Sequence, residues 1–366
     1  MKRIGIITYH RSQNYGAQLQ AYATRTALEK MGYRAEVIDC NRIGQVVKLF
    51  HWNFSSLKGF LGALRNNALS LVSEKKRRRL FAAFSEQKIG LSAPCHTRTE
   101  LESLCAEYDA VITGSDQVWH PQICEGNTAF FLDLPLRPEQ KIAYAPSFGV
   151  PDYTEEDAQR YMPLINDIAH LSVREEAGQA LIRRRLNREA PLVLDPTMLL
   201  TREDWDTIAR PAPYRRYLLY FTILDEPPGT DALVRRIAAE RGLRIVRIGR
   251  LKDILKRGFI NARANGPQEF LGLVRDADFI ITSSFHGSVF SILYQKDFLC
   301  IFNNNNRNSR LETLARRLGI ESCFVHDVKN INTFTACQTP DYTTAAKRLA
   351  QGKEESLAFL RQALSS

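Results

Sequence analysis

The chain has 366 residues, of which 44% are hydrophobic and 25% are charged, a composition typical of a soluble globular protein with room for two domains. Its cysteines are an odd number, seven, without a C-x-x-C pair, which argues against a disulfide framework or a zinc ribbon and favours reduced thiols in the cytoplasm. The first residues are too few for the apolar part of a signal peptide, and no apolar run approaches the about 18 residues expected of a membrane-spanning helix.

The net charge of +10 is concentrated in one segment of the chain. Residues 41–80 hold nine Lys or Arg and one acid, mixed with aromatic and aliphatic side chains. This mixture suits an amphipathic segment on an anionic membrane surface. Nucleic-acid binding would use the same charge, and a solvated helical insertion that packs its apolar face on the body would need neither partner. We predict a basic amphipathic insertion at 42–90, with membrane contact through 42–79 and no nucleic-acid partner.

Strands and helices alternate through the first half of the chain. The apolar runs predict strands near 3–8, 35–39, 110–113, 141–148, 170–174 and 191–195. Between the first two of these strands, residues 17–31 show one apolar helical face, and Gly32 is well placed to end the helix.

The second half repeats this alternation and leads to a fold prediction. Strands are expected near 217–222, 244–249, 278–284 and 298–302, with helices near 232–242, 267–277, 286–295, 310–319 and 342–364. Such alternation indicates parallel sheets covered by helices. We therefore predict an α/β protein with two Rossmann-like domains that face a central cleft, at 1–198 and 199–338. The helix within 339–366 is expected to pack back on the first domain.

Ligands bind at the carboxyl ends of the strands in such sheets, so the loops after the strands are the places to look. In S-S-F-H-G-S, Ser283 or Ser284 can cap the following helix, and His286 and Gly287 fall in its first turn. Free backbone N–H groups there favour an anion. Gly287 would let a ligand approach the backbone, and His286 could move a proton near neutral pH. The other interpretation is a histidine that only caps the helix or bonds a nearby carbonyl.

Two further loops carry polar residues at strand ends. In T-G-S-D, Gly114 permits close approach, while Ser115 and Asp116 could bind hydroxyl groups or cap a helix. In S-V-R-E-E, Arg174 could clamp a carboxylate or a phosphate, or it could form a salt bridge to Glu175, Glu176 or another acid.

The remaining candidates lie in two other loops. Asn14, Tyr15 and Gly16 follow the first strand and suit either a small-ligand loop or a tight turn. Arg307 and Arg310, in the polar tract after the strand near 298–302, could reach a phosphate or stay in a solvated loop.

Several familiar fingerprints are missing from the sequence. It has no G-x-x-x-x-G-K-[ST], no G-x-G-x-x-G, no H-E-x-x-H and no metal-binding spacing of Cys and His. The D-A-D at 276–278 precedes a strand, so we interpret it as a helix-to-strand turn rather than a metal-binding motif. These absences point to an anion other than a dinucleotide, and to no metal.

The motifs together resemble the polysaccharide pyruvyl transferase family. The matching pieces are N-Y-G-A-Q-L-Q-A-Y-A, T-G-S-D-Q-V-W, S-V-R-E, V-L-D-P-T, S-S-F-H-G-S and N-x-R-x-S-R-L-E-T-L, in this order from residue 4 to about 319. The resemblance implies a fold like that of the GT-B glycosyltransferases. It also implies transfer of the enolpyruvyl unit of phosphoenolpyruvate to a sugar, which gives a pyruvate ketal and free phosphate, with phosphoenolpyruvate as co-substrate and no other cofactor.

The resemblance also assigns roles to residues. The histidine, arginine and acid of the family fall on His286, Arg174 and Asp116, which become the catalytic candidates. The expected donor-binding residues are Ser283, Ser284, Gly287, Ser288, Arg307 and Arg310, and the expected acceptor-binding residues are Asn14, Tyr15, Gly16, Gly114 and Ser115. Many members carry arginine where this chain has Ser284; Arg307, Arg310 or Lys296 could substitute for it.

The acceptor is expected to be a hexose of a surface polysaccharide, carried by a polyprenyl lipid. This expectation places the protein in the cytoplasm, peripheral on the inner face of the membrane. Two alternatives remain open at this point. One is a GT-B glycosyltransferase that uses a nucleotide sugar, and the other is a membrane-associated assembly subunit without catalytic activity, which the loss of arginine at 284 would suit.

Overall fold

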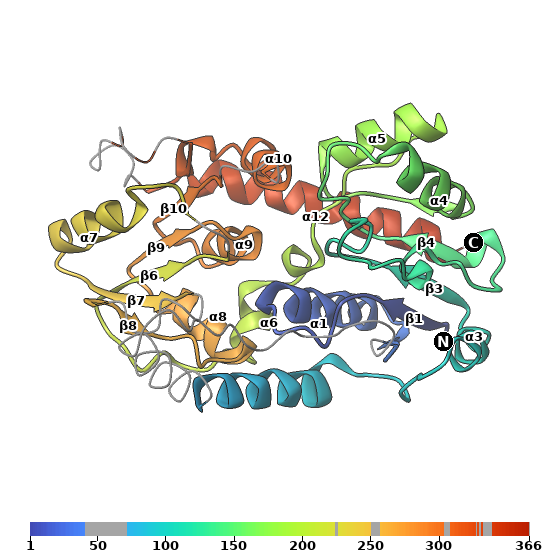
Figure 1. Cartoon of the computed structure of the whole chain (residues 1–366), viewed down its shortest axis with the longest axis horizontal. Coiled ribbons are helices and arrows are strands. Elements are labelled where there is room, and N and C mark those ends of the chain that lie inside the picture. Colours follow the sequence, from blue (N-terminus) through green and yellow to red (C-terminus); the bar gives the residue numbers. More distant parts are fainter. Residues whose placement is uncertain are drawn as a thin grey trace, which may run out of the picture.

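The computed structural model describes residues 1–40, 72–223, 226–249, 257–303, 308–326, 328, 331 and 339–365. Within these residues the chain forms two parallel sheets that lie side by side, each flanked by helices (Figure 1). The predicted α/β fold with two Rossmann-like units in a GT-B-like arrangement is thus confirmed.

The first sheet has five described strands in the order β2-β1-β3-β4-β5. They are β1 (Arg3–Ile7), β2 (Arg34–Val37), β3 (Ala110–Thr113), β4 (Lys141–Ala143) and β5 (His170–Leu171). Adjacent strands pair in parallel, with Ile6 opposite Val37 on one side and Ile112 on the other. Because β1 and β3 are buried on both faces, they are apolar without alternation, as expected for a covered parallel sheet.

The elements around this sheet follow the expected alternation. The longer helices are α1 (Tyr15–Lys30), α3 (Arg98–Cys105), α4 (Glu155–Asn166) and α5 (Glu176–Leu186). Short turns of helix are η1 (Ser85–Ile89), η2 (Thr128–Phe131), η3 (Pro138–Gln140) and η4 (Pro196–Met198), and α6 (Arg202–Asp206) follows in the connection to the second sheet. Sequence reasoning did not identify α4, in which Pro163 interrupts the usual helical composition.

The second sheet has six described strands in the order β11-β10-β9-β6-β7-β8. They are β6 (Tyr217–Phe221), β7 (Arg244–Ile248), β8 (Ile260–Asn261), β9 (Phe279–Thr282), β10 (Phe298–Ile301) and β11 (Phe324–Val325). Its helices are α7 (Thr230–Glu240), α8 (Pro267–Arg275), α9 (Phe285–Leu293) and α10 (Ser309–Leu318), with a short turn at η6 (Glu321–Cys323). The D-A-D motif is the predicted turn, since Asp276 is the C-cap of α8 and Asp278 directly precedes β9.

The C-terminal helix α12 (Tyr342–Ser365) passes along the second sheet and returns to the first (Figure 1). At its far end Lys2 Nζ donates a hydrogen bond to the carbonyl oxygen of Leu364, 2.7 Å away. In its middle, the buried Ser356 hydroxyl accepts from the Leu194 N–H at 2.9 Å. The helix therefore ties the second half of the chain to the first.

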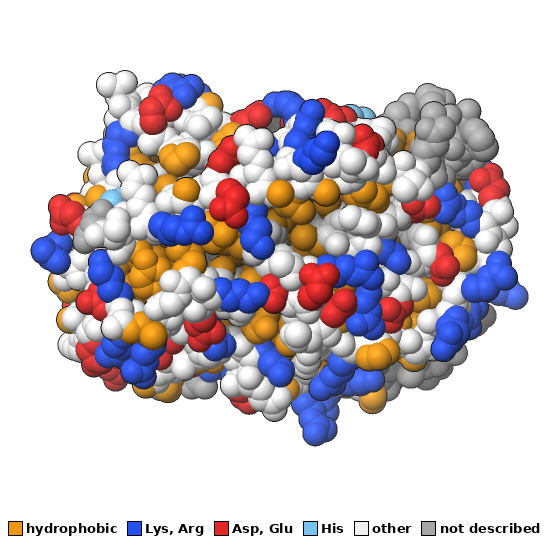
Figure 2. All heavy atoms as spheres, turned by 180° about the vertical axis from the view of Figure 1, so that it is seen from behind, with side chains coloured by type: hydrophobic (Ala, Val, Ile, Leu, Met, Phe, Trp, Pro, Cys, Tyr) orange, Lys and Arg blue, Asp and Glu red, His pale blue; other side chains and the backbone are white. Residues whose placement is uncertain are grey.

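The basic segment is described only in part. Most of 42–79 lies outside the described residues, but residues 72–84 are helical, and Phe81 and Phe84 on this helix are buried. No described helix is long and apolar enough to cross a membrane. On the face shown in Figure 2, cationic and anionic side chains are interspersed, so the described part of that face offers no continuous cationic surface to anionic lipid.

The contact between α12 and the first half gives a stability prediction. In Ser356→Ala the buried Leu194 N–H loses its acceptor, which should lower the free energy of unfolding by about 1–3 kcal/mol. Ser365→Ala, on the same helix, removes an exposed hydroxyl that bonds only Gln362 and should leave stability unchanged. Urea titration of the two variants and the unsubstituted chain checks this; equal stability of all three would contradict it.

Candidate active site

The first turns of α1 and α9 meet between the two sheets. Asn14 caps α1 by accepting from the Gly16 and Ala17 N–H groups at 2.9 and 3.3 Å. Gly16 then lies against His286 so closely that a Cβ on it would be 1.9 Å from the His286 Nδ1. A glycine is therefore required at position 16 for the imidazole to occupy its place.

Asp195 is the anionic centre of the site, and it is fully buried. Its Oδ2 lies 2.5 Å from Arg174 Nη1 and 3.1 Å from the Ser115 hydroxyl, while its Oδ1 accepts from Thr197. Burial alone would raise the pKa of Asp195, but the His286 ring and the Arg174 guanidinium outweigh it and hold that pKa well below its usual range. Asp195 is thus a carboxylate throughout the neutral range.

His286 stands beside this carboxylate without a hydrogen bond to it. Its Nε2 is 3.6 Å from Asp195 Oδ2 and has no hydrogen-bond partner within the described residues. The ring is buried except for its contribution to a cavity wall. A buried ring nitrogen without a partner is uncommon, and here it lies beside a carboxylate in a residue that lines the cavity.

Arg174 lies beneath the cavity rather than on its wall. Its side chain is 2% exposed, and its guanidinium stacks under the Phe285 ring at 4.6 Å. Besides Asp195 it approaches Asp116 Oδ1 at 3.8 Å. Glu175 does not pair with it, because one Glu175 carboxylate oxygen accepts instead from Ser147 and Phe148. Of the two interpretations made from the sequence, the ion pair is present, although with acids distant in the sequence.

Arg310 is the second cation of the site and lines the cavity. Its guanidinium makes no hydrogen bond to a described residue, and its Nε is buried. Burial, and then repulsion by Arg174, lowers the pKa of Arg310 to about 10, which still leaves it protonated at neutral pH. An anion bound near Arg310 would offset both effects by its opposite charge, as Glu175, Asp116 and Asp195 already do in part.

The cavity that these groups share has a volume of about 200 Å³. Its lining combines residues of both halves of the chain: Asn14, Asp116, Gln117, Ile223, Ser283, Ser284, Phe285, His286, Asn303, Arg310 and Leu311. In the described part of the chain, no three His, Cys, Asp or Glu side chains are grouped as metal ligands.

Some predicted residues support the site without facing the cavity. Ser115 is fully buried, with its N–H donating to Gln20 and its hydroxyl close to Ala145 and Asp195. Gly114 has φ +108°, and a Cβ there would lie 2.3 Å from the Tyr144 carbonyl oxygen. Neither Ser115 nor Gly114 lines the cavity, and the polar groups of Ser115 are used within the protein, so the expected contact of these residues with an acceptor stays a prediction.

The first turn of α9 is capped from within the protein. Ser284 is the N-cap of α9, since its hydroxyl accepts from the Gly287 N–H at 3.2 Å, and the Ser288 N–H donates to the Ser284 carbonyl. A Cβ on Gly287 would meet the side chains of Thr282 and Phe221. The N–H groups of Gly287 and Ser288 thus have partners within the protein, and their predicted contact with an anion stays a prediction. The glycine at 287 allows α9 to pack against β9.

The three residues that could replace the family's arginine differ in their positions. Lys296 lies beyond the far end of α9, where its Nζ donates to the Arg275 carbonyl oxygen, so it is not part of the site. Arg307 lies outside the described residues. Arg310 is the candidate that the structure brings to His286.

Sequence reasoning missed the central residue, Asp195. The V-L-D-P-T motif was recognised, but Asp195 was given no role. Its signal was an acid at a strand end followed by Pro-Thr, the pattern of a capped turn, and it does cap η4 through the Thr197 N–H at 3.0 Å. Gln117 and Asn303, which also line the cavity, carried no comparable signal.

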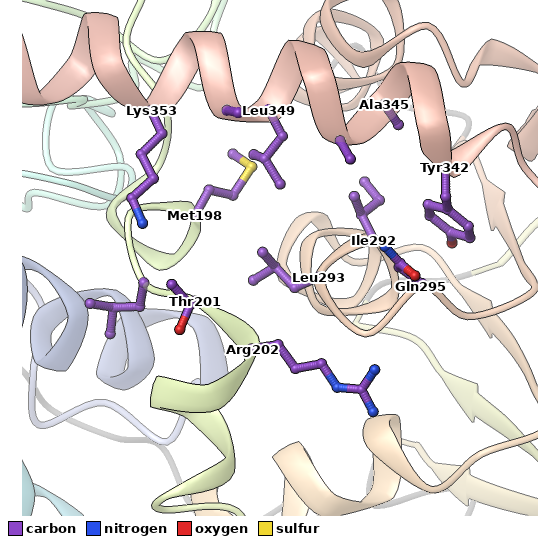
Figure 3. A pocket seen from close by; sticks show the side chains of 13 residues that line it. Met198, Thr201, Arg202, Ile292, Leu293, Gln295, Tyr342, Ala345, Leu349 and Lys353 are labelled. Carbon is purple, nitrogen blue, oxygen red and sulfur yellow. The ribbon is translucent and has the colours of Figure 1, made fainter.

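A larger cavity, of about 240 Å³, lies on the other side of α9. Figure 3 shows Ala345, Leu349 and Lys353 of α12 pointing toward Met198 of η4 and toward Ile292 and Leu293 of α9. It is mostly apolar, and none of the predicted catalytic residues lines it. This cavity belongs to the connection between the two halves, and its described lining has Lys353 and Tyr342 but no His, Asp or Glu.

The chain is similar in sequence to one protein family and in fold to several solved structures. The family model "polysaccharide pyruvyl transferase" matches residues 14–305. No curated protein matches the chain in sequence.

Solved structures with a similar fold include UDP-GlcNAc 2-epimerases. That of Methanocaldococcus jannaschii is 12% identical, with 96% of this chain and 99% of that chain covered and a TM-score of 0.47. That of Neisseria meningitidis is 11% identical, with 97% and 94% covered and a TM-score of 0.49. The spinosyn rhamnosyltransferase SpnG is 10% identical, with both chains fully covered and a TM-score of 0.44.

The buried pair of Arg174 and Asp195 gives a second stability prediction. Asp195→Asn leaves the Arg174 guanidinium buried without its closest carboxylate, and it should lower the free energy of unfolding by about 3–5 kcal/mol at pH 7. Because the pKa of Asp195 is depressed in the folded protein, its contribution is complete above about pH 5 and declines as the pH falls below about 4. The difference between variant and unsubstituted chain should therefore shrink in acid.

Urea titrations at several pH values check this expectation. Glu189→Gln, which breaks the exposed pair with Arg183, is the control and should have no measurable effect. A difference for Asp195→Asn that grows in acid would contradict the assignment.

Proposed function

The chain belongs to the polysaccharide pyruvyl transferase family, and on this premise we propose that it transfers the enolpyruvyl unit of phosphoenolpyruvate to a hexose of a surface polysaccharide or of its lipid-linked precursor. The observation that carries the proposal is the combination of His286 and Arg310 on one cavity, each with a nitrogen that lacks a hydrogen-bond partner among the described residues.

Arg310 and His286 on the cavity wall suit a small anion, while Asp116 on the same wall offsets one positive charge. Phosphoenolpyruvate carries a carboxylate and a phosphate, and the guanidinium of Arg310 can bind either one bidentately. Arg174, stacked beneath Phe285, adds a positive field from below without reaching the cavity wall. In this proposal Arg310 replaces the family arginine that is Ser284 in this chain.

The proposed reaction needs one group that both gives and accepts a proton. His286 delivers a proton to the methylene carbon of phosphoenolpyruvate, which makes the adjacent carbon cationic. A sugar hydroxyl attacks that carbon, and its proton returns to His286. The bond to the phosphate oxygen then breaks, and attack by a second hydroxyl closes the ketal while phosphate leaves with the remaining proton.

Two carboxylates would direct these steps. Asp195 stabilises a protonated His286 ring and fixes the place of Arg174, but it is buried and touches no bound molecule; it is a positioning residue. In this proposal Asp116, which lines the cavity, accepts a hydrogen bond from the attacking sugar hydroxyl.

Replacement of His286 tests the chemical step. In His286→Ala, turnover with phosphoenolpyruvate and a sugar acceptor should fall by about 10²–10⁴ because the proton donor is lost. The assay is release of inorganic phosphate with a panel of hexosides. His96→Ala, at an exposed histidine, is the control and should keep full activity; full turnover in His286→Ala would refute the role.

Replacement of Arg310 tests the donor site and separates the function from a nucleotide-sugar transferase. Phosphoenolpyruvate should raise the melting temperature of the unsubstituted chain, and a nucleoside diphosphate should not. In Arg310→Met the stabilisation should disappear, and KM for phosphoenolpyruvate should rise about tenfold or more, since a charged hydrogen bond is lost. Arg310→Lys should recover part of the affinity. Stabilisation by a nucleoside diphosphate alone would favour the glycosyltransferase.

Cytoplasmic location and membrane contact through 42–79 remain part of this proposal. They rest on the basic, aromatic composition of that segment and on the lipid carrier that such acceptors use.

A further inference from the structure

A second cavity, of about 130 Å³, adjoins the first between the two halves of the chain. Asn14 and Ile223 line both cavities. The second one lies at the carboxyl ends of β6 and β7, where a parallel sheet presents its ligands, and it is lined there by Thr222 and Gly249. Its volume suffices for several water molecules, and so for a phosphate-sized group.

The first notable side chain of this cavity is Arg77. It is 7% exposed and stacks on Tyr15 and Phe81, with its guanidinium carbon 4.7 and 4.5 Å from the two ring centroids. Its hydrogen bonds go to the Tyr15 hydroxyl and to the carbonyl oxygens of Gln13 and Arg263. No carboxylate of the described residues pairs with it, so this buried cation is solvated by neutral groups alone.

The second is Arg263, from the opposite half of the chain. Its Nη1 donates to the Gly249 carbonyl at 3.1 Å, and its Nη2 lies 3.1 Å from Glu74 Oε2. Its Nε is buried and lacks a hydrogen-bond partner within the described residues. Glu74 is shared with Arg78, at 3.5 Å. Two guanidiniums therefore line the cavity, and the one described carboxylate that pairs with either, Glu74, is shared with Arg78. The balance of charge is positive, and the Arg263 Nε–H is a donor without a partner among the described residues.

We propose that this cavity binds an anionic group of the acceptor, a phosphate or diphosphate ester linked to the sugar that receives the pyruvyl unit. Guanidinium pairs bind such groups bidentately. The donor's own anionic groups are matched by Arg310 beside His286, and the second cavity lies across Asn14 and Ile223 from that position. Tyr15, an expected acceptor-binding residue, lines this second cavity and not the first.

This inference rests on the proposed function for the identity of the acceptor, but its charge argument can be tested alone. Arg77 is a poor first target, because its loss could unfold the region that it holds. Arg263→Gln and Glu74→Gln form a matched pair, since both break the same ion pair. If that pair only holds the structure together, both variants should change binding in the same direction. If Arg263 binds an anion, the two changes should be opposite.

The first measurement is binding of inorganic pyrophosphate by calorimetry, which needs no turnover. Arg263→Gln should weaken binding about tenfold or more, and Glu74→Gln should strengthen it severalfold by freeing Arg263. Arg310→Met should retain the Arg263-dependent site. Binding that is lost only in Arg310→Met, or equal effects of Arg263→Gln and Glu74→Gln, would overturn the subsite.

The second measurement is steady-state kinetics with a hexose and with its 1-phosphate. Arg263→Gln should raise KM for the phosphorylated acceptor about tenfold and leave KM for phosphoenolpyruvate and for the plain hexose unchanged. A higher KM for phosphoenolpyruvate would assign the cavity to the donor and overturn the inference. Absence of pyruvyl transfer to any acceptor, with the pyrophosphate result intact, would reject the proposed function but keep the anion site.

Discussion

The close contact between Gly16 and His286 is the constraint on which the site depends. The two residues belong to helices that start from different sheets, and no side chain fits between them, since a Cβ on Gly16 would lie 1.9 Å from the imidazole. The ring is thus held by the packing of one half of the chain on the other. Tyr15, the neighbour of Gly16, stacks on Phe270 with a centroid distance of 4.6 Å, so the same turn that admits the imidazole also joins α1 to α8. Any relative motion of the two halves must move His286 with respect to the acids of the first sheet.

Asp195 supplies the buried negative charge around which the polar groups of the site are arranged. A carboxylate with no exposure would be strongly destabilising by itself, yet it has Arg174, Ser115 and Thr197 as partners. Arg174 is stabilised in turn but keeps Nε and Nη2 without hydrogen bonds in the described part of the chain. Stabilisation is therefore concentrated on the carboxylate, and Arg310 is the cation of the site that has no ion pair among the described residues. An anion can enter a cavity of this kind without displacing an existing ion pair.

The fold was predictable because its pattern is repeated many times. Strands such as β3 and β9 are short apolar runs that end in small polar residues, and their alternation with helices left one architecture to consider. The place of His286 and Arg310 near one another follows from the same rule, since they follow neighbouring strands, β9 and β10, of one parallel sheet, whereas Asp116 comes from the first sheet. What could not be predicted depends on the detailed packing of side chains, both within each half and between the two. The role of Asp195 and the packing role of Gly287 against Thr282 need distances that no spacing in the sequence contains.

Each of the two cavities has a cation without a carboxylate partner among the described residues. Around His286 the positive charge of Arg174 is already paired with Asp195 and Asp116, so Arg310 is the cation left to bind a ligand there. Around Tyr15 the carboxylate of Glu74 is divided between Arg78 and Arg263, and Arg77 has only neutral acceptors. A molecule with one anionic end could be held at either cavity, but two anionic molecules can be held together only if each occupies its own. The proposed transfer requires donor and acceptor at the same time, and two separate cationic positions, at cavities that share Asn14 and Ile223, would keep their anionic groups apart.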